Sequence, residues 1–291
     1  MSVALLTVEA LREVPHDAEG RPLVVDARPR AAYLEGHIPG ARHMAWEEWC
    51  APGPTSNHPI TGQPGYWGRL EDDSAHARTH YARQLEAHGV THAQPVVVYA
   101  DGAPSKGREG RIAWMLLYLG VRDVALLDGG WSAWRLAGGP VAPGAEPAPS
   151  SACSFGGVIQ ARRRALLPTL RQAYTAGRLP LPIDIRAAAD FAGHVHPYLP
   201  RMGHLPGAVL LPYDDLFLPS GHFIGRERYL RRLPAGVLDA ETVVTYCEVG
   251  VRAATVALLH EAYTGGVVAT YDGSLMEWGL DPALPVLTTP F

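Results

Sequence analysis

A single cysteine stands near the C-terminal end, where a strand-like pattern gives way to a helix-like one. The stretch VVTYCEVGVRAATVALLHEAY (residues 243–263) has an apolar, β-branched run before Cys247 and an alanine-rich run after it. Gly250 lets the short connection close, so that backbone N–H groups at the start of the helix converge on the sulfur. The helix dipole and the nearby Arg252 both stabilise an anion there. The pattern therefore predicts a thiolate nucleophile at Cys247.

The other cysteines lack such a setting. A free cysteine at a strand end is often only a small core residue, but the glycine, the arginine and the strand-to-helix change favour catalysis at Cys247. Cys50 lies beside a proline-rich insertion and Cys153 lies in a proline-rich linker, so both are interpreted as ordinary thiols. Three cysteines without a CxxC pair predict neither a disulfide framework nor a structural zinc site.

Composition excludes several classes of protein. The chain has 291 residues, 47% of them hydrophobic, which is enough for two domains with a core each. Its formal charge of −4 comes from 25 basic and 29 acidic residues that are intermixed, so no basic stripe for nucleic acid is present. No apolar run is long enough to cross a membrane and no signal peptide pattern occurs, so we expect a cytoplasmic protein.

The chain contains two copies of one sequence unit. Four motifs recur in the same order: an Asp-x-Arg turn, a Gly-His-apolar-Pro-Gly-Ala stretch, a Val-rich strand, and an Asp-Gly motif that ends in tryptophan. The pairs are 26–28 with 184–186, 36–41 with 203–208, 95–102 with 242–250, and 126–134 with 270–278. We therefore predict an N-terminal domain over residues 1–140, a Pro- and Ala-rich linker over 141–158, and a C-terminal domain over 159–291.

The expected fold of each copy is α/β. Short strands rich in Val, Leu and Ile alternate with helical stretches such as 108–120 and 252–263, which indicates a parallel β-sheet with helices on both faces. Ligands of such sheets bind beyond the carboxyl ends of the strands, where Cys247 stands. Arg186 follows the strand that opens the same copy, and its planar guanidinium suits an oxyanion.

Taken together, these motifs resemble the rhodanese family, specifically its two-domain thiosulfate and 3-mercaptopyruvate sulfurtransferases. The resemblance covers nearly the whole chain and rests on the Asp-x-Arg turns, GHIPGA and GHLPGA, LDGGWSAW, CEVGVR and YDGSLMEW. It implies that the loop cysteine of the second domain takes sulfane sulfur from a donor as a persulfide and passes it to an acceptor, without a cofactor or a metal. The N-terminal domain would be non-catalytic, because Ala100 stands where the second copy has Cys247.

The resemblance also assigns roles to individual residues. Cys247 would carry the persulfide, and Arg186 would help to hold a small anionic donor. The acceptor would be cyanide, a thiol or a thioredoxin-like protein. The residues implied for the substrate cradle are Glu248, Val249, Gly250, Val251 and Arg252. Structural roles are expected for Asp26, Asp184, His37 and His204 in turns, and for Trp134 and Trp278 in the core.

The loop sequence leaves the donor open. Thiosulfate-preferring members resemble Cys-Arg-Lys-Gly-Val-Thr and mercaptopyruvate-preferring ones Cys-Gly-Ser-Gly-Val-Thr, whereas here the loop is Cys-Glu-Val-Gly-Val-Arg. Glu248 places an acid where family members have a basic or neutral residue, and Val249 lacks both the lysine charge and the serine hydroxyl. We favour thiosulfate, with 3-mercaptopyruvate as the alternative donor and a non-catalytic rhodanese-like binding or regulatory module as the alternative class.

Two further classes are disfavoured. Phosphatases that resemble this fold need five residues between the cysteine and the arginine, and here only Glu248 to Val251 intervene, a loop sized for one sulfur. Metal binding would draw on His76 and His80 at helical spacing or on His194 and His196. The first pair lacks the glutamate of the zinc-protease motif, and the second falls in an insertion with no carboxylate close in sequence, so no metal is expected.

Overall fold

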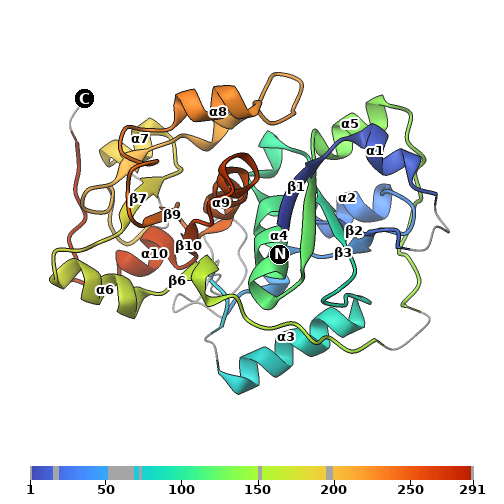
Figure 1. Cartoon of the computed structure of the whole chain (residues 1–291), viewed down its shortest axis with the longest axis horizontal. Coiled ribbons are helices and arrows are strands. Elements are labelled where there is room, and N and C mark those ends of the chain that lie inside the picture. The colour runs from blue at the N-terminus through green and yellow to red at the C-terminus, as the bar shows by residue number, and fades with distance from the viewer. Residues whose placement is uncertain are drawn as a thin grey trace. The chain divides into compact units, whose positions relative to one another are not determined.

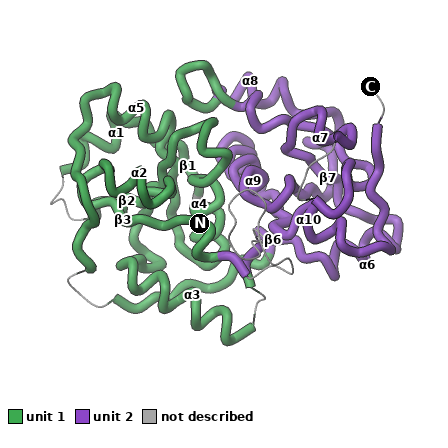
Figure 2. Tube along the Cα trace, turned by 180° about the vertical axis from the view of Figure 1, so that it is seen from behind, with its two compact units in different colours: residues 1–49, 71–161, 217–223 green, residues 50–70, 162–216, 224–291 purple. Residues whose placement is uncertain are grey.

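The computed structural model of the protein contains two compact units (Figures 1 and 2). The structure describes residues 2–15, 20–51, 69–71, 74–149, 153–194 and 199–289. The first unit consists of residues 1–49, 71–161 and 217–223, and the second of residues 50–70, 162–216 and 224–291. Each unit is thus built mainly from one half of the chain and includes a short segment of the other half. The sequence did not predict this exchange, and the domain boundaries proposed above stay a prediction.

The first unit contains a five-stranded parallel sheet in the order β1-β5-β4-β2-β3. Its strands are β1 (Ser2–Leu6), β2 (Leu23–Asp26), β3 (Arg42–His43), β4 (Val96–Tyr99) and β5 (Asp123–Leu127). All four residues of β4 are buried. Such continuous apolar strands are typical of a parallel sheet that is covered on both faces.

Helices cover both faces of this sheet. They are α1 (Val8–Glu13), α2 (Arg30–Glu35), α3 (Ala75–Ala87), α4 (Arg108–Leu119) and α5 (Gly130–Leu136). Figure 1 shows α4 on one side of the sheet and α1 and α5 on the other. One core cluster joins α1 and α5 to the sheet, and it includes Leu11, Val97, Leu127 and Trp134.

The second unit repeats the same topology. Its strand order is β6-β10-β9-β7-β8, again all parallel. The strands are β6 (Arg164–Ala165), β7 (Leu181–Asp184), β8 (Val209–Leu210), β9 (Val243–Tyr246) and β10 (Ala269–Tyr271). The helices are α6 (Leu167–Thr175), α7 (Ala188–Ala192), α8 (Arg226–Arg232), α9 (Val251–Thr264) and α10 (Ser274–Trp278). The prediction of two tandem α/β domains with parallel sheets is confirmed.

The Asp-x-Arg motifs form buried ion pairs at the ends of β2 and β7. Arg28 Nη2 lies 2.6 Å from Asp26 Oδ2, and Arg186 Nη2 lies 2.6 Å from Asp184 Oδ2. Each guanidinium also donates to a carbonyl of the Gly-His motif, at 2.6 Å in the first unit and 2.5 Å in the second. The motif therefore ties each strand end to the turn that follows it.

The histidines and tryptophans of the repeats have the structural roles expected for them. His37 Nδ1 lies 3.0 Å from a carbonyl oxygen of α2, and His204 Nδ1 lies 2.9 Å from a carbonyl oxygen of α7. Trp134 and Trp278 are buried, and each donates its indole N–H to a proline carbonyl. These contacts hold the turns and close the two cores.

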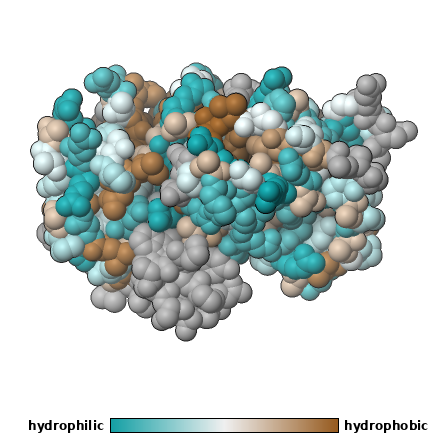
Figure 3. Space-filling model, turned by 90° about the horizontal axis from the view of Figure 1, so that it is seen from below, coloured by the Kyte–Doolittle hydropathy of each residue, from teal (hydrophilic) through white to brown (hydrophobic). Residues whose placement is uncertain are grey.

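Within the ranges that the structure describes, no helix is both long and apolar enough to cross a bilayer. Exposed large apolar side chains are few, for example Leu136, Val158 and Leu238. On the face shown in Figure 3, apolar residues lie in small groups among hydrophilic ones, which is usual for a protein surface.

Candidate active site

Cys247 lies where the sequence predicted it, between a strand and the helix that follows. It comes directly after β9, and α9 begins at Val251. The residue is 1% exposed. Gly250 is the N-cap of α9, with φ 80° in the left-handed region that favours glycine. The connection is therefore as tight as the CEVGVR pattern indicated.

The sulfur accepts a backbone hydrogen bond at the start of α9. Gly250 N–H donates to Cys247 Sγ at 3.2 Å. A side chain at Gly250 would not fit, because a Cβ there would lie 2.5 Å from the carbonyl oxygen of Asp272. Gly250 thus meets three needs at once: the left-handed turn, the close approach to Asp272 and the donor to the sulfur.

The backbone of the loop rests on the turn between β10 and α10. Ser274 Oγ accepts a hydrogen bond from Cys247 N–H at 3.1 Å, and Leu275 N–H donates to Cys247 O at 3.2 Å. Met276 N–H donates to Glu248 O at 3.0 Å. Both backbone polar groups of Cys247 are therefore held by residues far along the chain.

Sequence reasoning missed Ser274. In the sequence, YDGSLMEW stands out only as the motif that closes the second domain. Ser274 adopts φ 52°, a left-handed conformation that costs a non-glycine residue about 1 kcal/mol, and its Oγ also donates to Tyr271 O at 2.8 Å. The first unit has Gly130 at this position, with φ 55°. A serine where the other copy has glycine was the available signal.

Glu248 and Arg252 form an ion pair beside the sulfur-bearing residue. They are four residues apart, and a guanidinium N–H of Arg252 donates to Glu248 Oε1. Glu248 is buried, which opposes its ionisation, but Arg252 and then Arg186 outweigh burial and hold the pKa of this carboxyl below its ordinary value. At neutral pH Glu248 is therefore an anion that partly neutralises Arg252.

Arg186 lies in the buried ion pair with Asp184. Its side chain is 1% exposed. Burial works against the charged guanidinium, but the hydrogen bonds and charge of Asp184 outweigh it and raise the pKa of Arg186 above its ordinary value. The hydrogen bonds of its Nε and Nη2 go to Asp184 and to Gly203 O. A role in donor binding stays a prediction.

The two valines of the loop are buried to different extents. Val249 packs against the core cluster of the second unit, and Val251 is buried. Val249 keeps part of its surface exposed, whereas Val251 is almost fully buried.

The first unit has the same frame without the sulfur. Ala100 follows β4, and Trp131 N–H donates to Ala100 O at 2.8 Å, as Leu275 does to Cys247. The connection to α4 is longer and contains a 3-10 turn over Ala103–Ser105. That the first domain is non-catalytic stays a prediction.

The histidines considered as metal ligands lie on α3 and after α7. His76 and His80 lie exposed on α3, His194 is exposed after α7, and His196 lies outside the described residues. Within the described part of the chain, no group of three or more His, Cys, Asp or Glu residues could hold a metal ion. Cys153 Sγ lies 3.6 Å from Glu86 O and is partly buried.

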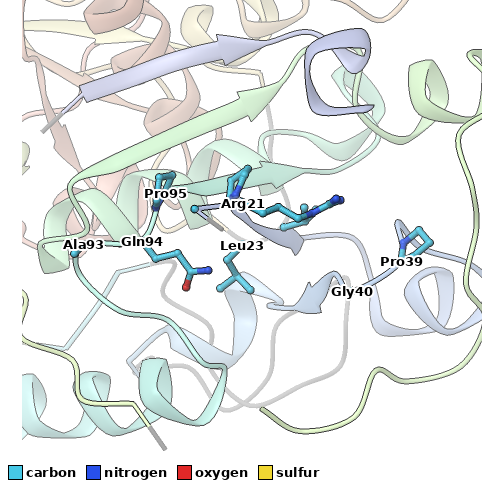
Figure 4. Close-up of a pocket in the computed structure, with 10 residues that line it drawn as sticks. Arg21, Leu23, Pro39, Gly40, Ala93, Gln94 and Pro95 are labelled. Atoms are coloured by element: carbon cyan, nitrogen blue, oxygen red, sulfur yellow. The ribbon is translucent and has the colours of Figure 1, made fainter. Parts of the chain in front are cut away.

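Two similar pockets lie at the opposite end of the strands. The pocket of the first unit, about 630 Å³, is lined by residues 20–24, 39–40 and 93–95 at the amino ends of β2 and β4 (Figure 4). Its counterpart in the second unit, about 670 Å³, includes Leu181, Pro206 and Thr242. Arg21, whose charged side chain lines the first pocket, donates to Val14 O at 2.8 Å. Neither pocket adjoins the carboxyl ends of the strands, where ligands of such sheets bind.

Comparison with known proteins decides the family. A family model described as "Rhodanese-like domain" matches residues 7–137 and again residues 169–281. The chain belongs to the two-domain rhodanese family. The two matches fall on the two sequence copies, in agreement with the resemblance inferred from the motifs.

Curated relatives of this rhodanese carry sulfurtransferase names. "Putative thiosulfate sulfurtransferase SseB" of Mycobacterium tuberculosis is 33% identical over 88% of this chain and 84% of its own length. "Probable 3-mercaptopyruvate sulfurtransferase" of Pseudomonas aeruginosa is 32% identical over 88% of this chain and 86% of its own. The protein in the crystal structure of YnjE is 25% identical in sequence. The two structures align with a TM-score of 0.78, and the alignment covers 99% of this chain and 68% of the YnjE chain. The rhodanese thus has relatives named for either donor.

Proposed function

We propose that this rhodanese is a sulfurtransferase that moves sulfane sulfur from thiosulfate to a thiophilic acceptor through a persulfide on Cys247. The observation that carries the proposal is the buried Cys247 sulfur at the N-terminal end of α9, which accepts the Gly250 N–H at 3.2 Å. The positive end of the helix and this N–H group stabilise an anionic sulfur. The names of the relatives support sulfur transfer.

The reaction has two half-steps. The Cys247 thiolate attacks the sulfane sulfur of thiosulfate, a new S–S bond forms, and the bond to the sulfonate sulfur breaks with its electron pair leaving on sulfite. An acceptor then attacks the outer sulfur of the persulfide and releases the thiolate again. Such a ping-pong scheme needs no cofactor. The acceptor is cyanide in an assay, and a thiol or a thioredoxin-like protein in the cell.

The alternative donor is 3-mercaptopyruvate. The Cys247 thiolate would attack its sulfur, the C–S bond would break, and the electron pair would leave on the enolate of pyruvate, which takes up a proton. The ion pair of Glu248 with Arg252 favours this reading, because it reduces the positive charge that a doubly charged donor would meet. Relative kcat/KM for the two donors decides between them.

Intact-mass spectrometry after incubation with either donor tests the proposal. We expect a gain of one sulfur atom, reversal by cyanide, and no gain in Cys247→Ser. Cys153→Ser is the matched control and should gain sulfur as the wild type does. Failure of the wild type to gain sulfur from either donor would contradict the proposal and favour a non-catalytic binding module.

The free cysteines fit a reducing compartment, and we propose that the protein is located in the cytoplasm.

A further inference from the structure

A residue from the first half of the chain is clamped inside the second unit. Leu70 is fully buried, and its N–H donates to Asp272 Oδ2 at 2.8 Å. Its carbonyl accepts from Arg164 Nη2, also at 2.8 Å. Arg164 Nε in turn lies 3.0 Å from Asp272 Oδ1, and both side chains are 2% exposed. Both backbone polar groups of Leu70 therefore bind one buried ion pair.

The first unit contains the counterpart of this contact. Phe223, from the second half of the chain, donates its N–H to Asp128 Oδ1 at 2.8 Å. Asp128 and Asp272 occupy the same position in the two Asp-Gly motifs. The strand register places Leu5 where the second unit has Arg164, so the first unit lacks the arginine half of the clamp. In both units, therefore, the aspartate of the Asp-Gly motif binds a backbone N–H from the other half of the chain, and only the second unit also contains Cys247.

Asp272 links the clamp to the sulfur. Its backbone lies directly against Gly250, since a Cβ on Gly250 would be 2.5 Å from Asp272 O and 2.6 Å from Asp272 Cα. Gly250 supplies the N–H that reaches Cys247 Sγ. The residue two places after Asp272 is Ser274, which accepts the Cys247 N–H. A shift of Asp272 would therefore displace both the Gly250 N–H at the Cys247 sulfur and the Ser274 hydroxyl at the Cys247 N–H.

We propose that Asp272 is a positioning residue for Cys247. Its carboxylate, held by Leu70 and Arg164, fixes the backbone on which Gly250 rests and so fixes the N–H donor to the sulfur. Through the Leu70 peptide, the first half of the chain takes part in building the site of the second. The proposal rests on the proposed function only where sulfur transfer is the readout.

The test compares Asp272→Asn with Asp128→Asn. An asparagine keeps the shape of the side chain but removes the charge that pairs with Arg164, and Asp128→Asn makes the same change in the unit without a catalytic cysteine. The readouts are the rate of alkylation of Cys247 by iodoacetamide, followed by peptide mass spectrometry, and the rate of sulfur loading from thiosulfate. Cys153 alkylation in the same samples is the internal control.

We expect Asp272→Asn to slow alkylation of Cys247 and to lower kcat for sulfur loading, each about tenfold, with KM changed less than about twofold. Asp128→Asn should leave both rates within about twofold of the wild type. Cys153 should react at an unchanged rate in both variants. A general loosening of the fold would instead change Cys153 as well.

Equal Cys247 rates in the two folded variants would overturn the proposal, and so would a matching change at Cys153. If Asp272→Asn is not recovered folded, Arg164→Gln removes the other half of the clamp and is judged by the same rates. If the wild type takes no sulfur from any donor, the proposed function fails, whereas the alkylation rates still decide the role of Asp272.

Discussion

Ser274 holds Cys247 by the backbone: its Oγ accepts the Cys247 N–H at 3.1 Å while its own backbone stays in the left-handed region at φ 52°. The equivalent residue of the first unit is Gly130, which adopts φ 55° without strain and faces Ala100 instead of a cysteine. At this position of the repeat a strained, non-glycine residue therefore stands only in the unit that contains Cys247, where its hydroxyl binds the Cys247 N–H.

Replacement of Ser274 separates stability from reactivity. Ser274→Gly removes about 1 kcal/mol of backbone strain and both hydrogen bonds of the hydroxyl, each worth about 1 kcal/mol, so the free energy of unfolding should fall by only about 1 kcal/mol. Ser274→Ala keeps the strain and loses both bonds, and should destabilise by about 2 kcal/mol. We expect both variants to load sulfur more slowly. Urea unfolding and intact-mass kinetics check this, and a wild-type loading rate in Ser274→Gly would refute it.

The charge of Glu248 should select between donors of different charge. Methanethiosulfonate offers the same sulfane sulfur as thiosulfate with one negative charge in place of two. Glu248→Gln frees Arg252 from its counter-ion, so kcat/KM for thiosulfate relative to methanethiosulfonate should rise about fivefold or more. Glu47→Gln is the matched control, because Glu47 pairs with Arg108 in the first unit. An unchanged ratio in Glu248→Gln would remove Glu248 from donor selection.

Glu109 should make stability depend on pH. Burial of this carboxyl raises its pKa from 4.5 to about 7. The hydrogen bond that the Ser105 hydroxyl donates to Oε2 lowers the pKa, but burial has the larger effect. Between these values the unfolded chain has released the proton and the folded chain has not, so stability falls as pH rises. Glu109→Gln should thus raise the free energy of unfolding at pH 8 by about 2–3 kcal/mol and leave it unchanged at pH 4. Urea unfolding at both pH values checks this, with exposed Glu35→Gln as control.

Arg186 and Arg28 allow the structural and donor-binding roles to be distinguished. Both arginines form buried ion pairs of the same geometry. A lysine keeps the charge but loses the two-point contact with the aspartate, so Arg186→Lys and Arg28→Lys should each lose about 2 kcal/mol of stability. If Arg186 also holds the donor, as the resemblance implies, KM for thiosulfate rises in Arg186→Lys alone. An unchanged KM would leave Arg186 a structural residue.

Much of the site was predictable because its signals are local. Cys247, Gly250 and the start of α9 lie within a few residues of one another, and the switch from strand to helix period marks their place in the fold. The repeat of Asp-x-Arg and Gly-His motifs likewise needed only a comparison of the chain with itself. Such features depend on spacing along the chain, which the sequence displays directly.

The sequence by itself determined the α/β class, the duplication and the cysteine at the strand end. Only the tertiary structure decided what supports that cysteine: Ser274 at its N–H, Asp272 against Gly250, and Leu70 held by Asp272 across 202 positions of the chain. No periodicity distinguishes Leu70 from other apolar residues near a proline-rich insertion. Its partner is set by how the two halves of the chain exchange segments, and that depends on packing between distant residues.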